Sequence, residues 1–380
     1  MRKKHCFADL YRFELKKILK NKVAVVSFII FFLFSFIQGV FEVRGNIDPA
    51  VLDKYDTING RAVDEELMNE LLAVTDEVGN VSEEGEAYTD LRDMVKKIIG
   101  AGASFNDLTI DRVYRDRLTS ITEGYEDARL TEGEIAYWQE REAEIEKPFV
   151  FHDSVVMSGV FHGITNYAMI MLFIIAVSLS SIFAYETQRR TDAMIRSTIN
   201  GIKELYFAKV LAGMTYVMIS LVLYVASFLI CIGATWGFRG MDMSIISYLP
   251  FTQMDMTGWQ LAGILITVLF LGTMLVSAFA LFVSNLSRNS IATMAIVTGV
   301  YLGMFAASTV IPMKMRFLSQ TLSLLPSTFI SERLVYEYRL IGSGGYLRAY
   351  QVAPVLYIGL TLVLIFSGYL LYKKYEIKNN

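Results

Sequence analysis

Six runs of mostly apolar residues divide this chain, and each is long enough to be a transmembrane helix. A helix needs about 20 such residues to cross the hydrocarbon core of a bilayer, and 54% of the 380 residues are apolar. The sequence therefore predicts an all-α polytopic membrane protein with six transmembrane helices. The expected spans are Val23 to Phe41, Ile164 to Ala184, Val210 to Ala234, Leu261 to Val283, Ile291 to Ile311 and Pro354 to Tyr372.

The distribution of lysine and arginine predicts how these spans are oriented. These residues are concentrated in residues 1–22, in the loop between the second and third spans, and in the tail 373–380. Because cytoplasmic loops carry an excess of Lys and Arg, we expect both termini in the cytoplasm and residues 42–163 outside. The expected location is the inner (cytoplasmic) membrane of a bacterial cell. The first span, 23–41, is longer than the apolar core of a signal peptide, and no Ala-x-Ala site follows it, so we expect it to remain as an anchor.

Residues 42–163, between the first and second spans, are expected to form a helical extracytoplasmic domain. Residues 43–160 hold 27 acidic and 12 basic residues, a net charge of −15, while the rest of the chain carries +12. Thr131 and Glu134 fit a capping box that starts a helix running to Lys147. The acid clusters are interpreted as a solvated face, with a site for a cation or cationic peptide as the alternative. Two apolar stripes at helical spacing predict a packed core: Leu67, Leu71, Leu72 and Val78, and Leu91, Met94, Val95, Ile98 and Ile99.

Two further segments are expected to lie at the membrane surfaces. Residues 1–22 carry apolar side chains at three- and four-residue steps among lysines, which predicts an amphipathic helix on lipids of the cytoplasmic leaflet. The loop 312–353 is expected outside, yet it has five Lys or Arg against two Glu, which conflicts with that orientation. Within it, residues 317–331 are apolar, too short to span and interrupted by Pro326, so they either dip into the membrane or lie on its surface.

Residue types that the sequence lacks exclude several classes of function. The spans have no ionisable residue at mid-membrane depth, whereas proton- and ion-coupled carriers need such residues. The chain has no G-x-x-x-x-G-K-[ST] loop for ATP and no H-E-x-x-H or G-x-S-x-G motif. Its two cysteines and three histidines are too few and too scattered for a metal site. We expect a non-catalytic chain that binds no cofactor directly and no nucleic acid.

The segment between the second and third spans resembles a known loop. Glu186 follows the second span, Arg189 and Arg190 come next, and residues 197–209 read Ser-Thr-Ile-Asn-Gly-Ile-Lys-Glu-Leu-Tyr-Phe-Ala-Lys. This pattern resembles the cytoplasmic loop of type-two ATP-binding-cassette (ABC) exporter permeases, in which an acidic residue precedes Ser-Thr-Pro-x-Ser-Arg-x-x-aliphatic-x-x-small-Lys. The matching residues are Glu186, Ser197, Thr198, Leu205, Ala208 and Lys209. The residues that depart from the pattern are Ile199, Gly201 and Ile202, in place of the proline, second serine and arginine, with Lys203 one place later.

The resemblance implies that residues 185–209 form a coupling loop that docks onto a separate ABC ATPase subunit. That partner would bind the ATP and magnesium, and a second copy of this chain or a related permease would complete the membrane unit. A peptide, drug or lipid-like molecule is the expected export substrate, with no substrate-binding residue assigned. The expected coupling residues are Glu186, Arg189, Arg190, Arg196, Ser197, Thr198, Gly201, Lys203, Glu204 and Lys209.

Other interpretations of the same features stay open. Residues 185–209 are also compatible with an ordinary basic cytoplasmic loop. The chain as a whole is compatible with a membrane-anchored sensor or scaffold, whose outside domain binds a ligand while the spans only hold it in place. A passive channel is less favoured, because no span carries the polar stripe of a water-filled path.

Overall fold

Helices account for all the regular secondary structure in the part of the chain that the structure describes. The computed structural model describes residues 2–45, 53–100, 102–106, 108–198, 201–327, 337–342 and 345–374. Within these ranges there are only isolated β-bridges and no strand. The helices are α1 (Arg2–Lys20), α2 (Lys22–Gly45), α4 (Glu65–Ala73), η1 (Glu83–Tyr88), α5 (Thr89–Ile99), α6 (Ile110–Ala128), α7 (Glu132–Glu144), α8 (Val155–Leu179), α9 (Ser181–Gln188), α10 (Asp192–Arg196), α11 (Lys203–Thr235), η2 (Ile245–Ser247), α12 (Gly258–Ser287), α13 (Ser290–Val310), α14 (Arg316–Ser323) and α16 (Ala349–Lys374).

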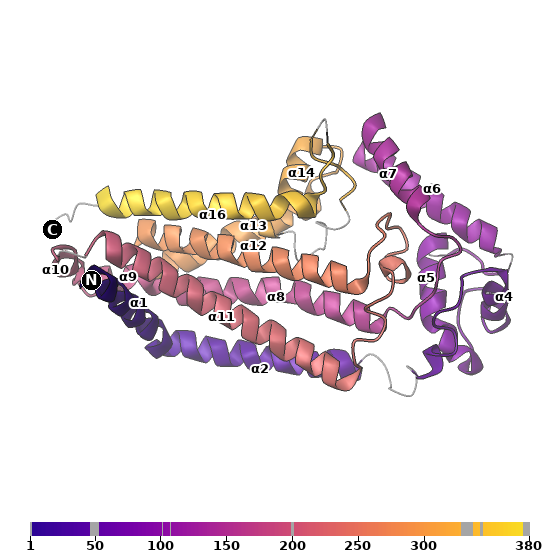
Figure 1. Cartoon of the computed structure of the whole chain (residues 1–380), viewed down its shortest axis with the longest axis horizontal. Coiled ribbons are helices and arrows are strands. Elements are labelled where there is room, and N and C mark those ends of the chain that lie inside the picture. Colours follow the sequence, from indigo (N-terminus) through magenta and orange to yellow (C-terminus); the bar gives the residue numbers. More distant parts are fainter. Residues whose placement is uncertain are drawn as a thin grey trace.

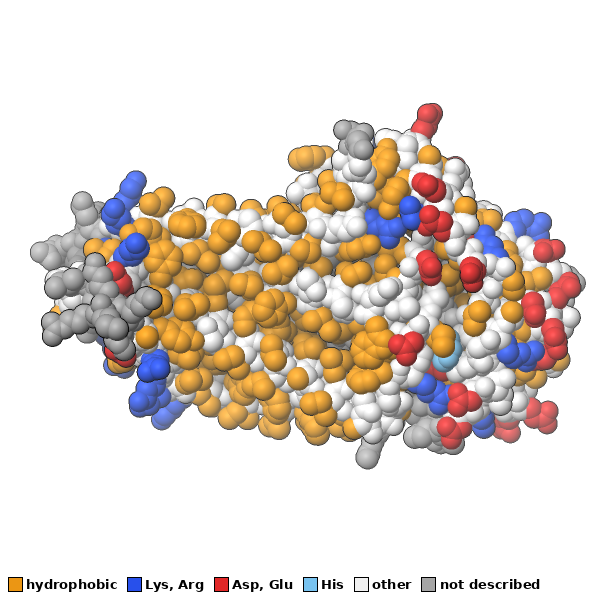
Figure 2. Space-filling view, viewed as in Figure 1, with side chains coloured by type: hydrophobic (Ala, Val, Ile, Leu, Met, Phe, Trp, Pro, Cys, Tyr) orange, Lys and Arg blue, Asp and Glu red, His pale blue; other side chains and the backbone are white. Residues whose placement is uncertain are grey.

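Six of these helical segments are long and apolar enough to cross a membrane, which confirms the predicted number of candidate spans. They are α2, α8 with α9, α11, α12, α13 and α16. They run side by side along the long axis of the molecule, with α4 to α7 gathered at one end and α1, α10 and the end of α16 at the other (Figure 1). Apolar side chains cover the flank of this bundle between two charged ends (Figure 2). The chain is therefore an all-α protein of the membrane-embedded kind.

The helices extend beyond the apolar runs that predict them. The α8 helix begins at Val155, ahead of the predicted start at Ile164, and α11 begins at Lys203, ahead of Val210. Hydropathy marks the part of a helix that suits lipid, whereas backbone hydrogen bonds continue until a residue caps or breaks the helix. Between α1 and α2 that residue is Asn21, whose side chain accepts a hydrogen bond from the backbone N–H of Val23.

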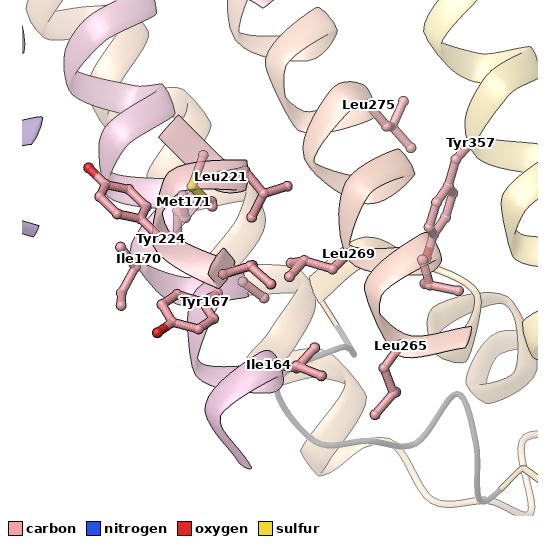
Figure 3. Packing of buried hydrophobic residues seen from close by; sticks show 14 of the residues in the cluster. Ile164, Tyr167, Ile170, Met171, Leu221, Tyr224, Leu265, Leu269, Leu275 and Tyr357 are labelled. Carbon is pink, nitrogen blue, oxygen red and sulfur yellow. The ribbon is translucent and has the colours of Figure 1, made fainter. Parts of the chain in front are cut away.

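The spans are not equally buried, and α8 and α12 form the centre of the bundle. In their most apolar stretches, 72% of the α8–α9 segment and 61% of α12 are buried, against 17% of α2 and of α13. Tyr167 of α8, Tyr224 of α11 and Leu269 of α12 belong to this core (Figure 3). The Tyr167 and Ser35 hydroxyls lie 2.7 Å apart, and the Tyr224 hydroxyl donates to the Phe28 carbonyl, so each of these buried hydroxyls has a partner on α2.

The helical domain has its own core, which the two predicted stripes largely build. Leu67, Leu71, Leu91 and Val95 are completely buried there. The capping box is also present, because Thr131 and Glu134 each bond the other's backbone N–H. Isolated helices shorter than about 12–15 residues are marginal in water, so this shared core stabilises the short helices α4 and α5.

Two details of the domain prediction are wrong. Val78 is 67% exposed, because α4 ends at Ala73 and the chain turns through Gly79, whose φ is +85°. The α7 helix ends at Glu144 instead of Lys147, because Ile145 adopts extended backbone angles and is itself buried. In both places the pattern used for the prediction continues along the sequence beyond the residue at which the helix ends.

A fully buried arginine, Arg117 of α6, joins the domain to the loop between α11 and α12. Its guanidinium donates to the Pro250 carbonyl at 2.5 Å, to the Thr252 carbonyl at 2.8 Å and to the Glu142 carboxylate at 2.7 Å. It also lies over the Phe149 ring. Buried charges are stable only when paired and hydrogen-bonded, so these contacts hold the loop against the domain.

The basic loop after α13 also packs on the domain, which explains the charge conflict in the sequence. Arg316 donates to buried Glu134 at 2.6 Å, and the Leu340 N–H donates to the same carboxylate oxygen at 2.8 Å. Arg348 lies over the rings of Tyr137 and Trp138. Burial by itself raises the pKa of Glu134, but these hydrogen bonds and those from Thr131 outweigh it and hold the pKa below its usual value. Arg316 and Arg348 of this loop thus contact the domain at its own end of the bundle.

Residues 316–323 of this loop form α14 beside the domain-side end of α13 (Figure 1). Phe317 is 85% exposed and Leu318 41% exposed, while Ser319 and Ser323 are buried. A helix with its apolar side outward beside the end of a span suits the membrane surface. Residues 328–331, the rest of the segment predicted to dip or lie flat, are outside the described residues.

A third contact joins the domain to the start of α8. The carboxylate of Asp90, the second residue of α5, accepts hydrogen bonds from the backbone N–H and the hydroxyl of Ser154, the N-cap of α8. The pKa of Asp90 is raised to about 6. Burial is the main cause, the nearby carboxylates of Asp153 and Asp93 add to it, and the hydrogen bonds from Ser154 oppose it.

We expect acidification to stabilise the folded chain through Asp90, because protonation removes a buried charge. The folded chain holds the Asp90 proton more tightly than the unfolded chain, whose usual pKa is 3.8, so the stabilisation is complete below pH 3.8 and is lost as the pH rises through about 6. Between pH 7 and pH 5 the gain is on the order of 1 kcal/mol. The measurement is the melting temperature of the detergent-solubilised protein at both pH values. Asp90→Asn should remove this share of the pH dependence, and Asp111→Asn, at an exposed position, should not. An equal pH dependence of the melting temperature in the two variants would contradict the role given to Asp90.

Candidate functional site

The predicted coupling segment forms a short helical corner at the end of the bundle opposite the domain (Figure 1). The α9 helix ends at Gln188, and Arg190 then takes a left-handed conformation with φ +56°. The Thr191 N–H donates to the Glu186 carbonyl at 3.0 Å, which closes the turn before α10. The chain thus turns twice within a few residues and returns as α11, with α10 between the two turns.

Beneath this corner lies a buried network of four charges. The Lys209 ammonium of α11, completely buried, donates to Glu186 of α9 at 2.7 Å, to Glu14 of α1 at 3.5 Å and to the Ile182 carbonyl at 3.1 Å. Lys17 of α1 pairs with Glu14 at 2.8 Å and with Glu186 at 3.2 Å. Two cations and two anions leave the network neutral, which limits the cost of placing charges between apolar helices. The network connects α1, α9 and α11.

The underside of α10 is fastened to the ends of two more spans. Arg196 donates to the Tyr372 carbonyl of α16 at 2.8 Å, and its guanidinium lies 4.6 Å from the centre of the Tyr372 ring. At the other end of α10, Asp192 lies 3.9 Å from Arg288, which follows α12. Five residues form too short a helix to be stable alone, so these contacts hold α10 in place.

Gly201 allows the turn between α10 and α11. A Cβ atom at this position would lie 2.0 Å from the Ile195 carbonyl oxygen, so no other residue fits without moving the backbone. Residue 199, where the sequence departs first from the permease pattern, and residue 200 are outside the described residues. The serine of that pattern would not fit at position 201, which gives a physical reason for the glycine there.

The outer face of the corner is mostly polar and basic, with one large apolar side chain at its centre. Met194, on α10, is 74% exposed. Large apolar side chains with that exposure mark contact surfaces when they lie among polar neighbours. The exposed neighbours are Gln188, Arg189, Arg190, Ala193, Ser197, Thr198 and Lys203.

The ten residues predicted for coupling thus fall into different environments. Glu186, Lys209 and Gly201 are buried, and Arg196 is partly buried against Tyr372. Glu204 faces sideways, where it lines a groove of about 480 Å³ between α1, α11 and α16. The residues that the structure leaves exposed to a partner are Arg189, Arg190, Ser197, Thr198 and Lys203.

Sequence reasoning missed two members of the buried network, Glu14 and Lys17 of α1. A signal for Glu14 was present, because positions 7, 11, 14 and 18 lie on one face of a helix and the other three are apolar. An acidic residue within an apolar stripe needs a buried cation as its partner. The sequence alone does not show that this cation is Lys209, 195 residues further along.

No three His, Cys, Asp or Glu side chains in the described ranges are placed to hold a metal ion. Comparison of the chain with protein-family models, curated proteins and solved structures gives no match.

Proposed function

We propose that the chain is the membrane-spanning permease subunit of an ATP-driven ABC transporter, energised by a separate ATPase that docks on the α10 corner. The observation that carries the proposal is the two-sided construction of α10. Its outer face presents Met194 among exposed basic and polar residues, while its underside is bonded to α12 and α16 and lies over the network that joins α9, α11 and α1. Such a corner is better suited to transmitting force from a docked partner to the spans than to catalysing a reaction.

The proposed orientation places the α10 corner in the cytoplasm and the helical domain outside. Basic side chains gather at the α10 end and acidic ones over the domain (Figure 2), as the preference of cytoplasmic segments for Lys and Arg requires. The exposed basic residues at the α10 end include Arg12, Lys16, Lys20, Arg189, Arg190, Lys203, Lys373 and Lys374.

In this proposal, closure of the ATPase pushes α10 and the spans move with it. Packed helices with fixed polar contacts move as rigid bodies, so a push on α10 reaches α11 and α1 through Lys209 and α16 through Arg196. At the other end, Arg117 and Arg316 link the moving loops to the domain. A peptide, drug or lipid-like substrate would pass between this chain and a second copy or related permease.

The test is co-purification of the tagged chain from its host membranes in mild detergent, with ATP hydrolysis assayed on the eluate. Met194→Asp places a charge at the centre of the exposed face, and we expect recovery of the ATPase and its activity to fall roughly tenfold, as at a binding hot spot. Val78→Asp is the matched control, since Val78 is similarly exposed on the domain. A correctly folded chain recovered with no nucleotide-binding partner would favour the sensor or scaffold instead.

A further inference from the structure

A cavity of about 450 Å³ lies between the helical domain and the domain-side end of the spans. Its walls come from four separate parts of the chain: the ends of α5 and α6, residues 248–252, the α14 region and residues 337–339. Binding sites for small molecules fall in this size range and often lie where two units meet. The cavity is at the opposite end of the molecule from the α10 corner and takes no part in the proposed coupling.

One wall of the cavity is apolar and continues toward the membrane surface. Tyr248, Leu249 and Phe251 line it, together with Met313. Met313 is 49% exposed and lies between Val310, the end of α13, and Phe317 of α14, which are 78% and 85% exposed. These three exposed apolar residues lie close together in the chain at the domain-side end of the bundle, and Met313 among them lines the cavity.

The polar part of the lining carries charges of both signs. Glu337 and Arg339 pair with each other, and Arg339 also bonds Ser319, so these two charges satisfy one another. Lys97 and Asp127 are exposed. The Lys97 ammonium lies 5.7 Å from the centre of the Tyr248 ring, which places it over the apolar wall. The lining is neutral overall, with one cation and one anion available to a ligand.

We propose that this cavity binds a zwitterionic phospholipid-type amphiphile. Its phosphate faces Lys97, its ammonium group faces Asp127, and its acyl chain lies along Tyr248, Phe251 and Met313. A neutral lining with separated charges suits a headgroup that carries both signs, whereas an anionic headgroup such as phosphatidylglycerol would leave Asp127 without a cation.

The test uses the full chain in nanodiscs of phosphatidylglycerol with a trace of lysophosphatidylcholine that carries a photoreactive diazirine in its acyl chain. After illumination, mass spectrometry should find the label on residues 248–252 and near Met313. Unlabelled lysophosphatidylcholine should compete for this labelling, and lysophosphatidylglycerol should not. Lys97→Gln and Asp127→Asn should each lower labelling of the cavity roughly fivefold to tenfold, the effect of losing one charge-assisted hydrogen bond.

Neighbouring substitutions provide the matched controls. Lys96→Gln and Glu126→Gln remove the same charges from the same helices outside the lining and should leave labelling unchanged. Labelling of the lipid-facing side of α2 should be equal in all variants and serves as the internal standard. Three results would each overturn the proposal. They are label confined to the lipid-facing spans, equal competition by the anionic lipid, and cavity labelling that survives both Lys97→Gln and Asp127→Asn.

Discussion

Lys209→Met is expected to lower the free energy of unfolding by about 3 to 5 kcal/mol, the usual cost of removing one partner from a buried ion pair. The variant leaves Glu186 and Glu14 buried with Lys17 as their remaining cation, and the network then carries a net negative charge. The measurement is a denaturant titration in mixed detergent micelles. Trypsin should also cleave faster at Lys20, because α1 loses its Glu14–Lys209 ion pair with α11.

A double-mutant cycle separates the pair from the rest of the network. Glu186→Gln combined with Lys209→Met removes both charges, so the double variant should be more stable than the sum of the two single effects predicts, by about 1 to 3 kcal/mol. Lys203→Met is the control, since Lys203 is an exposed lysine of the same helix. Additive single effects would show that Lys209 and Glu186 act independently, contrary to their 2.7 Å contact.

The six candidate spans could be predicted from the sequence because lipid leaves the backbone few choices. Every buried N–H and C=O must be paired internally, so a run of about 20 apolar residues in a bilayer becomes a helix. The predicted stripe at Leu91, Met94, Val95 and Ile98 is buried for a related reason, since helical periodicity sets one face of α5 toward a core.

The contacts between helices could not be predicted in the same way. Glu186 and Lys209 match a loop pattern, and they were expected to meet a partner; in the structure they meet each other because α9 and α11 run in opposite directions. Two arginines of loop 312–353, Arg316 and Arg348, contact the domain, and the sequence alone does not show these contacts. Arg316 pairs with Glu134, 182 residues earlier in the chain, and a count of loop charges takes no account of such pairs.

Arg117→Met should detach the α11–α12 loop from the domain and lower the free energy of unfolding by about 2 to 4 kcal/mol. The carbonyl groups of Pro250 and Thr252 lose their donors, while Glu142 keeps Lys147 at 3.0 Å. Hydrogen–deuterium exchange should therefore rise in residues 249–254. The stability of Arg117→Lys should fall between those of the wild type and Arg117→Met. A lysine ammonium cannot satisfy three acceptors that are held in the fork geometry of a guanidinium.

The outcome of this substitution depends on how strongly the domain and the bundle are coupled. Arg115→Met is the control, an exposed arginine on the same helix, and equal exchange in both variants would contradict a fastening role for Arg117. If exchange rises in residues 249–254 while the core around Leu67 and Leu91 stays protected, Arg117 joins two units that fold separately. If that core loses protection as well, domain and bundle form one cooperative unit, and motion at the α10 corner then has a continuous path to the domain.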